Sequence, residues 1–181
     1  FQEFNIDEGH GAYFANPDNI NTIFSRVTGR NPSNLLGTLG VLGSADLVFL
    51  NPNGVLFGPN FQLDIEGSFT TTTSSGVIFP NGETFSSIKS EVPSLIENNL
   101  VAPIGLIFEG QTSAPIVSQG NLSTGDNLTL LAHTITVQNE LSAGNDLTLQ
   151  AEDTVKIEDS IDEAFVAIAG NNLSITGQNQ V

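Results

Sequence analysis

The residue types that carry most enzyme chemistry are sparse or scattered in this sequence. His10 and His133 lie far apart, and neither has a second metal-type ligand close by in the sequence. The acidic pairs Glu152-Asp153, Glu158-Asp159 and Asp162-Glu163 lack the ligand spacing of known calcium loops, so they indicate a solvated, self-repelling face. There is no cysteine, no phosphate-binding glycine loop and no Gly-x-Ser-x-Gly elbow. We therefore predict no catalytic residue, no metal site and no cofactor.

A hydrogen-bonding turn is the most specific local signal. Asn51-Pro52-Asn53-Gly54 lies between the apolar runs 47–50 and 55–57, which have the character of strands. Pro52 fixes φ at the first central position of the turn, and Asn53 or Gly54 can adopt a positive φ. The Asn51 side chain can bond the backbone of the same turn. These residues predict a tight turn that displays amide groups.

Charge excludes several classes of partner. The 181 residues include 20 Asp and Glu but only 4 Lys and Arg, a formal net charge of −16. Binding to nucleic acid or to an anionic lipid surface needs a cluster of basic side chains, which four residues do not supply. No apolar run is long enough for a transmembrane helix, and we expect any signal peptide to have been removed already. The absence of cysteine also suits a chain that crosses an oxidising compartment.

A repeat in the last third predicts the fold. A six-residue motif, Gly125-Asp126-Asn127-Leu128-Thr129-Leu130, recurs in similar form from Gly144 and again from Gly170. The second and third copies are further apart than the first and second, and we expect the added residues at 158–163. Short alternating strands such as 134–137 and 154–157 lie between the copies. A unit of about 19 residues with two or three strands favours one coil of a parallel β-helix over an antiparallel sandwich, the other fold with evenly spaced short strands. Asn121, Asn127 and Asn172 each begin an Asn-x-Ser/Thr pattern, or sequon, of the kind that accepts N-glycosylation. The repeat explains these sequons better, because in each case a turn asparagine precedes an inward leucine.

Two segments depart from the repeat. Residues 77–79 and 83–85 flank an Asn-Gly turn and predict a hairpin that projects from the coil, within a less regular region at 70–108. Residues 86–99 are polar and loop-like, and strand character resumes at 106–108. Ile20, Ile23, Phe24 and Val27 have helical spacing after Asp18, which predicts a short helix that covers the open end of the stack. A strand at 24–28 is the alternative for this segment.

Four motifs together resemble a known family. Phe1-Gln2-Glu3-Phe4-Asn5-Ile6, Ser25-Arg26-Val27-Thr28-Gly29, the stretch 31–39 and Asn51-Pro52-Asn53-Gly54-Val55 occur in the order found in the haemagglutination-activity, or two-partner-secretion (TPS), domain. This domain begins filamentous-haemagglutinin-like exoproteins of Gram-negative bacteria. The resemblance is specific up to about residue 68 and rests on the repeat beyond that point.

The resemblance implies a right-handed parallel β-helix over residues 1–181, a single domain of a longer secreted protein. It further implies that POTRA domains of a dedicated outer-membrane transporter recognise the chain in the periplasm before export to the surface. The family carries two secretion-linked Asn-Pro turns. One matches Asn51-Pro52-Asn53-Gly54, and the other falls at Asn16-Pro17, after which the motif departs from the family pattern.

We therefore expect a secretion-targeting and folding-nucleation module, monomeric and not an enzyme, that binds neither nucleic acid nor lipid. Two alternatives remain open: a polysaccharide-active β-helix enzyme, and a segment that itself adheres to glycans. The four basic residues are scattered and no pair of carboxylates is positioned by the sequence, which disfavours the enzyme.

Overall fold

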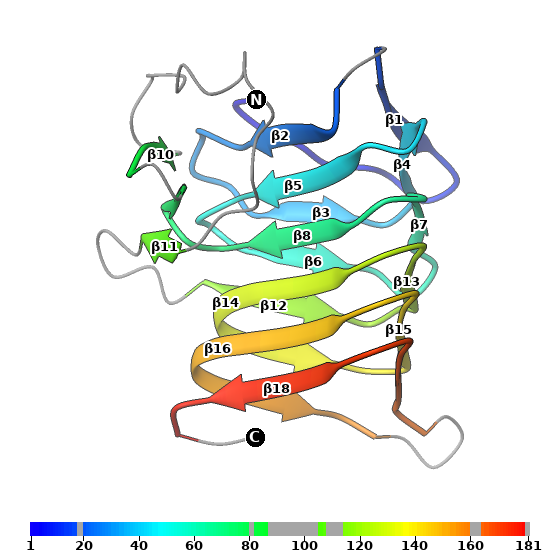
Figure 1. Ribbon diagram of the computed structural model, residues 1–181, viewed down its shortest axis with the longest axis vertical. Coiled ribbons are helices and arrows are strands. Elements are labelled where there is room, and N and C mark those ends of the chain that lie inside the picture. The colour runs from blue at the N-terminus through cyan, green and yellow to red at the C-terminus, as the bar shows by residue number, and fades with distance from the viewer. Residues whose placement is uncertain (18–19, 80–81, 87–104, 108–113, 160–163, 180–181) are drawn as a thin grey trace.

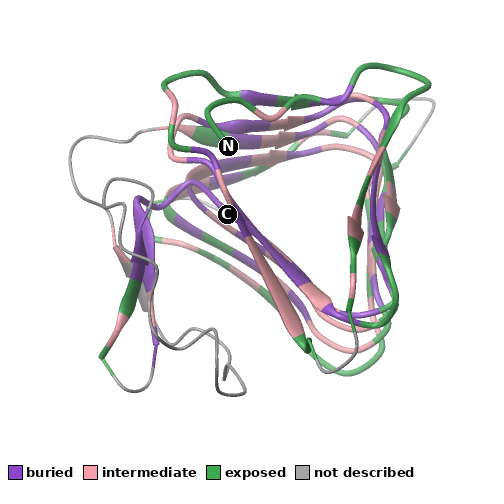
Figure 2. Cartoon of the chain, turned by 90° about the horizontal axis from the view of Figure 1, so that it is seen from above, coloured by how far each residue is buried: buried purple, intermediate pink, exposed green. Residues whose placement is uncertain are grey.

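The chain winds into a right-handed coil of short strands (Figure 1). The computed structural model describes residues 1–17, 20–79, 82–86, 105–107, 114–159 and 164–179. Within these ranges there is no helix, and every ladder between successive coils is parallel. Seen along its axis, the coil encloses a triangular section (Figure 2). Parallel pairing excludes the antiparallel sandwich and confirms the parallel β-helix.

Three sheets form the faces of the triangle, named here from Figure 1. The front sheet contains β2 (Thr22–Arg26), β5 (Asp46–Leu50), β8 (Phe69–Thr72), the first halves of β14 (Leu128–Val137) and β16 (Leu147–Ile157), and β18 (Leu173–Gly177). The back sheet contains β3 (Ser33–Leu35), β6 (Val55–Phe57), β12 (Pro115–Ser118) and the second halves of β14 and β16. The side sheet contains β1 (Gly11–Ala15), β4 (Thr38–Leu42), β7 (Gln62–Asp64), β13 (Leu122–Thr124), β15 (Glu140–Ala143) and β17 (Val166–Ala169).

The core consists of side-chain columns that run along the inside of the coil. One inward column of the front sheet is, in register, Ile23, Leu47, Phe69, Leu128, Leu147 and Leu173. Its four middle members have no exposed surface, whereas Leu173 in the last coil is 50% exposed. Burial of apolar surface contributes about 25 cal/mol per Å², so each coil stabilises the one before it.

The repeated glycines lie where successive coils stack backbone on backbone. A Cβ at Gly144 would lie 2.0 Å from the carbonyl oxygen of Gly125, and one at Gly170 would lie 2.0 Å from that of Gly144. Close approach, rather than a positive φ, therefore explains the repeat. The interval from Gly144 to Gly170 is longer than the interval from Gly125 to Gly144. The difference comes from one register shift within β16 and from added residues between Ile157 and Val166, which agrees with the insertion expected at 158–163.

A polar ladder follows the glycines along the corner between the side and front sheets. It consists of Asp46, Ser68, Asn127, Asp146 and Asn172. Asn127 Oδ1 accepts hydrogen bonds from the backbone N of Asp146 (3.1 Å) and from Asn145 Nδ2 (3.0 Å). Asp146 Oδ1 repeats this one coil later with the backbone N (3.1 Å) and Nδ2 (2.9 Å) of Asn172. The asparagines of two sequons, Asn127 and Asn172, thus join coils at this corner, as the repeat predicts.

A small antiparallel sheet lies outside the coil. It consists of β9 (Gly76–Ile78), β10 (Thr84–Ser86) and β11 (Gly105–Ile107), with β9 in the middle. The predicted hairpin is confirmed, and the predicted strand at 106–108 joins it as β11. The irregular region begins later than expected, because Thr70 to Thr72 belong to β8. The expected loop at 86–99 lies outside the described residues, apart from Ser86, which ends β10.

The predicted N-terminal helix is wrong, because this segment forms strand β2. Ser25 and Val27 point into the coil, while Phe24 and Arg26 point outward under the small sheet. Phe24 packs against Phe79 and Phe85, with ring centroids 5.5 and 5.4 Å apart. Both faces of β2 are thus covered, so its apolar residues do not show the alternation of a half-buried strand.

Aromatic rings take the place that we expected the helix to occupy. Phe4 stacks on Phe14 with ring centroids 6.1 Å apart and contacts Phe49 of the core at 5.2 Å. Phe1 packs edge-on against Phe4 at 5.2 Å. These rings cover the N-terminal end of the apolar columns, which protects the end of the solenoid.

One inward column contains two unsatisfied hydroxyls and supplies a stability prediction. Ser25, Phe49 and Thr71 are aligned on the front sheet, and neither Ser25 Oγ nor Thr71 Oγ1 has a hydrogen-bond partner among the described residues. Thr71→Val replaces a buried, unpaired hydroxyl with a methyl group of similar size. We expect it to raise the free energy of unfolding by about 1–2 kcal/mol, measured by urea denaturation. The matched change Thr70→Val, on the outer face, should stay within about 0.5 kcal/mol, and a destabilised Thr71→Val would contradict the assignment.

Candidate functional site

The candidate site is the corner between the front and back sheets where the turn 51–54 links β5 to β6. We call residues 29–33 and 51–54 the Asn-Pro corner. Asn51 is completely buried, at 0% exposure. Its Nδ2 donates to the carbonyl oxygen of Asn31 (3.1 Å) and to Ser33 Oγ (2.9 Å), both in the preceding coil. Its Oδ1 accepts from the backbone N and from Nδ2 of Asn53, each at 3.0 Å. The Asn51 amide therefore binds its own turn and the coil before it.

The other turn residues complete this link. Asn53 Nδ2 donates to the carbonyl oxygen of Gly29 at 2.9 Å. Gly54 adopts φ +116°, a conformation that a residue with a side chain rarely takes, and its carbonyl accepts from the backbone N of Ser33 at 3.0 Å. The predicted tight turn is confirmed, with the positive φ at Gly54.

The four motifs of the sequence analysis meet around this corner. The backbone N of Thr28 donates to the carbonyl oxygen of Phe1 (2.7 Å), and a Cβ on Gly29 would lie 2.0 Å from the carbonyl oxygen of Gln2. The backbone N of Asn34 donates to Asn5 Oδ1 at 2.8 Å. The segments 1–6, 25–29, 31–39 and 51–55, separate in sequence, thus form one contiguous structure.

The exposed part of the corner is distinct from the part that holds it together. Asn51 and Gly54 are buried, Pro52 and Asn53 are half-buried, and Asn31 and Pro32 are exposed. A molecule that approaches the folded corner meets Pro32, Asn31 and the outer side of Pro52. The Asn51 amide positions these residues and does not itself reach the surface, so the prediction that the turn displays its amide groups is wrong for Asn51, whose amide bonds are all made inside the corner.

Comparison with known proteins agrees with this architecture. The family described as "TPS secretion domain" matches residues 1–181, the whole chain. This chain belongs to the TPS secretion domain family. A relative, the heme/hemopexin-binding protein of Haemophilus influenzae, is 33% identical over 82 residues, which cover 45% of this chain and 9% of that protein. The matched TPS segment is therefore a small part of the length of this relative.

Membership in the family establishes the general function. The TPS domain is the secretion-targeting module of an exoprotein that Gram-negative bacteria pass through the outer membrane with a partner transporter. Members of the family are secretion and adhesin modules. The resemblance to a haemagglutinin-like exoprotein of two-partner secretion, which the motifs implied, is thereby confirmed.

The second Asn-Pro turn of this TPS domain lies at another corner. Asn16 and Pro17 follow β1, between the side and front sheets, whereas Asn51 follows β5 at the opposite edge of the front sheet (Figure 1). With its amide oriented to satisfy its neighbours, Asn16 Nδ2 donates to the carbonyl oxygen of Ile20 (3.0 Å) and its Oδ1 accepts from the backbone N of Ala45 (3.3 Å). The two turns are not brought together, but each asparagine links its turn to an adjacent coil.

Two partners of the turn 51–54, Ser33 for Asn51 and Gly29 for Asn53, were missed by sequence reasoning as site residues. Ser33 is fully buried, and Gly29 accepts the amide of Asn53. The available signal was a further Asn-Pro pair, Asn31-Pro32, which precedes Asn51-Pro52 by about one coil. That spacing places the two pairs in successive layers of the same corner.

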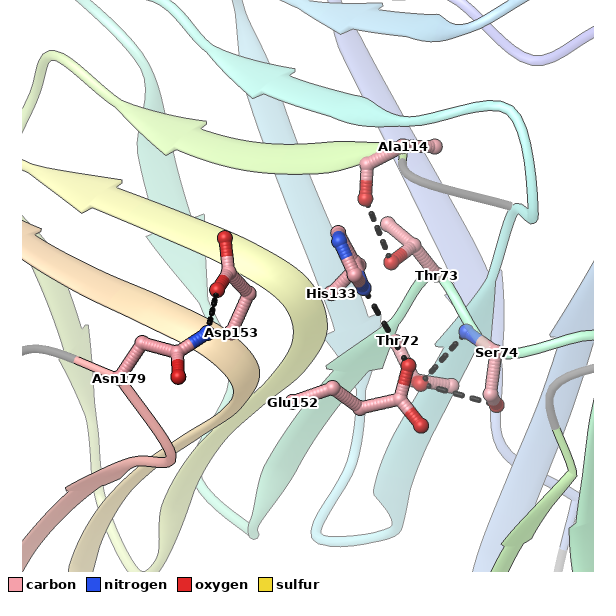
Figure 3. Close-up of polar contacts among 8 residues, drawn as sticks. All are labelled: Thr72, Thr73, Ser74, Ala114, His133, Glu152, Asp153 and Asn179. Carbon is pink, nitrogen blue, oxygen red and sulfur yellow. Dashed lines mark hydrogen bonds and ion pairs between the residues drawn. The ribbon is translucent and has the colours of Figure 1, made fainter. Parts of the chain in front are cut away.

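A run of hydroxyls that the sequence analysis also missed anchors the base of the small sheet. Thr73 Oγ1 donates to the carbonyl oxygen of Ala114 at 2.9 Å (Figure 3). This bond joins the point where the chain leaves the coil to the point where it returns. Thr72 Oγ1 donates to Ser74 Oγ at 3.0 Å. Ser75 Oγ donates to the carbonyl oxygen of Ile107 at 2.7 Å. These buried side chains fix the point at which the chain leaves and re-enters the β-helix.

The histidines and acidic residues occupy separate surface sites. His133 Nδ1 lies 3.4 Å from Glu152 Oε2, one coil away (Figure 3). Hydrogen bonds from Lys156 (2.5 Å) and Gln138 (2.6 Å) lower the pKa of Glu158. Asp162 and Glu163 lie outside the described residues. Within the described part of the chain, no group of three or more His, Asp or Glu side chains is arranged to hold a metal ion.

Proposed function

We propose that POTRA domains of the partner transporter recognise this TPS domain in the periplasm, and that the domain then nucleates folding of the polypeptide that follows it. The observation that carries the proposal is the family match over all 181 residues. The Asn-Pro corner supports it, because the family motifs converge there. The proposal includes the six residues of the two turns, Asn51, Pro52, Asn53, Gly54, Asn16 and Pro17.

Recognition would use the open N-terminal edge of the coil together with the Asn-Pro corner. No strand in the described ranges pairs with the outer edge of β1 or of β2, whereas β3 is covered by Ile6. A POTRA strand that adds to such an edge would gain backbone hydrogen bonds by β-augmentation. Pro32 and Pro52 lie on the exposed side of the corner and would contribute side-chain contacts.

Nucleation would use the opposite edge. Strands β17 and β18 have no partner strand beyond them within the described residues, and Ile168 and Leu173 are 48% and 50% exposed. A following coil would bury these side chains and pair with the backbone of β18. Stepwise addition of coils outside the cell would favour movement of the chain outward.

The test is association with purified POTRA domains of the cognate transporter, measured by stopped flow or surface plasmon resonance. A chain with net charge −16 should approach a basic docking surface faster at low salt. We expect the association rate to fall by about tenfold or more as salt rises to high ionic strength. Absence of binding would overturn the proposal, and a rate independent of salt would remove charge steering from it.

We further propose that the chain, a single domain, acts as a monomer without a cofactor, without catalysis and without direct binding to nucleic acid or lipid. Only four basic side chains accompany 20 acidic ones. Incubation with pectin and with neutral polysaccharides should yield no reducing ends and no unsaturated products. Turnover of any of these substrates would contradict the non-enzymatic assignment.

A further inference from the structure

A polar pocket lies on the outer face of the side sheet, remote from the Asn-Pro corner. Its volume is about 480 Å³, within the range of about 300–1,000 Å³ typical of small-molecule sites. Its floor is a row of three residues in register on neighbouring strands: Gly11 of β1, Thr38 of β4 and Gln62 of β7. Its rim is formed by the turn 8–10 and by Asn60.

An aromatic ring forms one side of this pocket and is held in a defined position. Tyr13 lies two residues beyond Gly11 on the same face, in register with Gly40 and Asp64. A Cβ on Gly40 would lie 2.4 Å from Cε1 of Tyr13, so the ring rests directly on the glycine. The Tyr13 hydroxyl donates a hydrogen bond to Asp64, which raises the pKa of the hydroxyl. The residue remains 46% exposed, and this is the only tyrosine in the sequence.

Two carboxylates lie near the ring, Glu8 on the rim and Asp64 beside the Tyr13 hydroxyl, and the other groups are amides, a hydroxyl and an imidazole. Asn60 Nδ2 donates to Glu8 Oε1 at 2.5 Å, which leaves the second oxygen of Glu8 available to a ligand. His10 Nδ1 lies 3.1 Å from the carbonyl oxygen of Glu8 and donates to it, which leaves Nε2 to bond a ligand hydroxyl. Thr38 and Gln62 add a hydroxyl and an amide from the floor. The pocket contains no basic lysine or arginine side chain.

We propose that this pocket binds an uncharged pyranose sugar, with the apolar face of the sugar packed on Tyr13 and its hydroxyls bonded to Glu8, His10 and Gln62. Such a ligand combines a flat apolar face with many hydroxyl donors, which matches an exposed ring beside several acceptors. Anionic sugars are disfavoured by Glu8, by the neighbouring Asp64 and by the net charge of −16. The assignment does not depend on recognition by the transporter, because the pocket lies on a different face.

Tyrosine fluorescence tests the proposal directly, since the sequence has one tyrosine and no tryptophan. The 181-residue chain is titrated with the methyl pyranosides of glucose, galactose and mannose and with N-acetylglucosamine, with glucuronic acid as the anionic control. We expect at least one neutral sugar to give a saturable change with a Kd of about 0.1–5 mM, as suits a shallow site. Glucuronic acid should bind at least tenfold more weakly than that sugar.

Variants then place the site. Gln62→Ala and Glu8→Gln should each weaken binding at least fivefold, whereas Leu42→Ala, at an exposed position of the same strand as Thr38, should leave it unchanged. Tyr13→Ala, followed by saturation-transfer NMR because the fluorophore is lost, should abolish binding while circular dichroism stays that of the parent chain. The proposal is overturned if no neutral sugar gives a saturable change below about 50 mM, or if glucuronic acid binds as tightly as the best neutral sugar. It is also overturned if the Tyr13→Ala chain binds that sugar with the affinity of the parent chain.

Discussion

Asn51→Asp should unfold the Asn-Pro corner and abolish export. The substitution replaces the two donors of Nδ2 by an oxygen, which then faces the carbonyl oxygen of Asn31 at a position with no exposure. A buried carboxylate with one oxygen held against a carbonyl oxygen is strongly unfavourable even though Asn53 still donates to its other oxygen, and we expect the free energy of unfolding to fall by about 3–5 kcal/mol. Urea denaturation measures this loss, and the fraction of chain in the medium measures export in cells that carry the transporter.

Two further substitutions separate folding from recognition. Asn34→Ala, at an exposed asparagine of the preceding coil, should change stability by less than about 0.5 kcal/mol and leave export intact. Pro52→Asn removes a half-buried ring and should preserve most of the stability while weakening POTRA binding. An Asn51→Asp chain with the stability and export of the parent would show that the buried amide does not hold the corner.

Gly144→Ala should break the stacking of the C-terminal coils. The added Cβ would lie 2.0 Å from the carbonyl oxygen of Gly125, a backbone atom that moves only if the two coils separate. We expect a loss of about 3 kcal/mol in stability and a melting temperature lower by roughly 6–12 °C. Thermal unfolding followed by circular dichroism measures both effects.

The control for this prediction is Gly82→Ala. Gly82 has φ +83° in the turn of the small sheet, and a Cβ there would meet nothing within 4 Å. Its replacement should cost about 1 kcal/mol through backbone strain alone. If Gly144→Ala were the milder of the two, close approach between coils would not explain the glycine repeat.

The repeat made the coil predictable, because each copy encodes the same local structure. The repeated unit is a glycine, two Asn or Asp residues and a leucine. It specifies a close backbone contact, a polar ladder and an inward leucine, and all three recur in register. Strand β2 was misassigned because a second layer covers its outer face. Phe24 is an outward-facing apolar residue because it packs against Phe79, which is far along the chain. The local periodicity of the sequence contains no information about that contact.

The candidate site was predictable as a turn but not as a link between coils. Asn51 and Gly54 show the chemistry of a tight turn in the sequence, and the structure has that turn. The bonds from Asn51 to Asn31 and Ser33 depend on the register between successive coils. The Tyr13 pocket is harder to predict from the sequence than the turn, because its floor takes one residue from each of three coils.

Export of a linked reporter tests the central assignment most directly. Residues 1–181 are placed between a cleavable signal peptide and a reporter that is otherwise retained in the periplasm, with and without the cognate transporter. We expect the reporter in the medium only when both the TPS domain and the transporter are present. A reporter that stays in the periplasm with both present, or reaches the medium without the domain, would contradict the assignment.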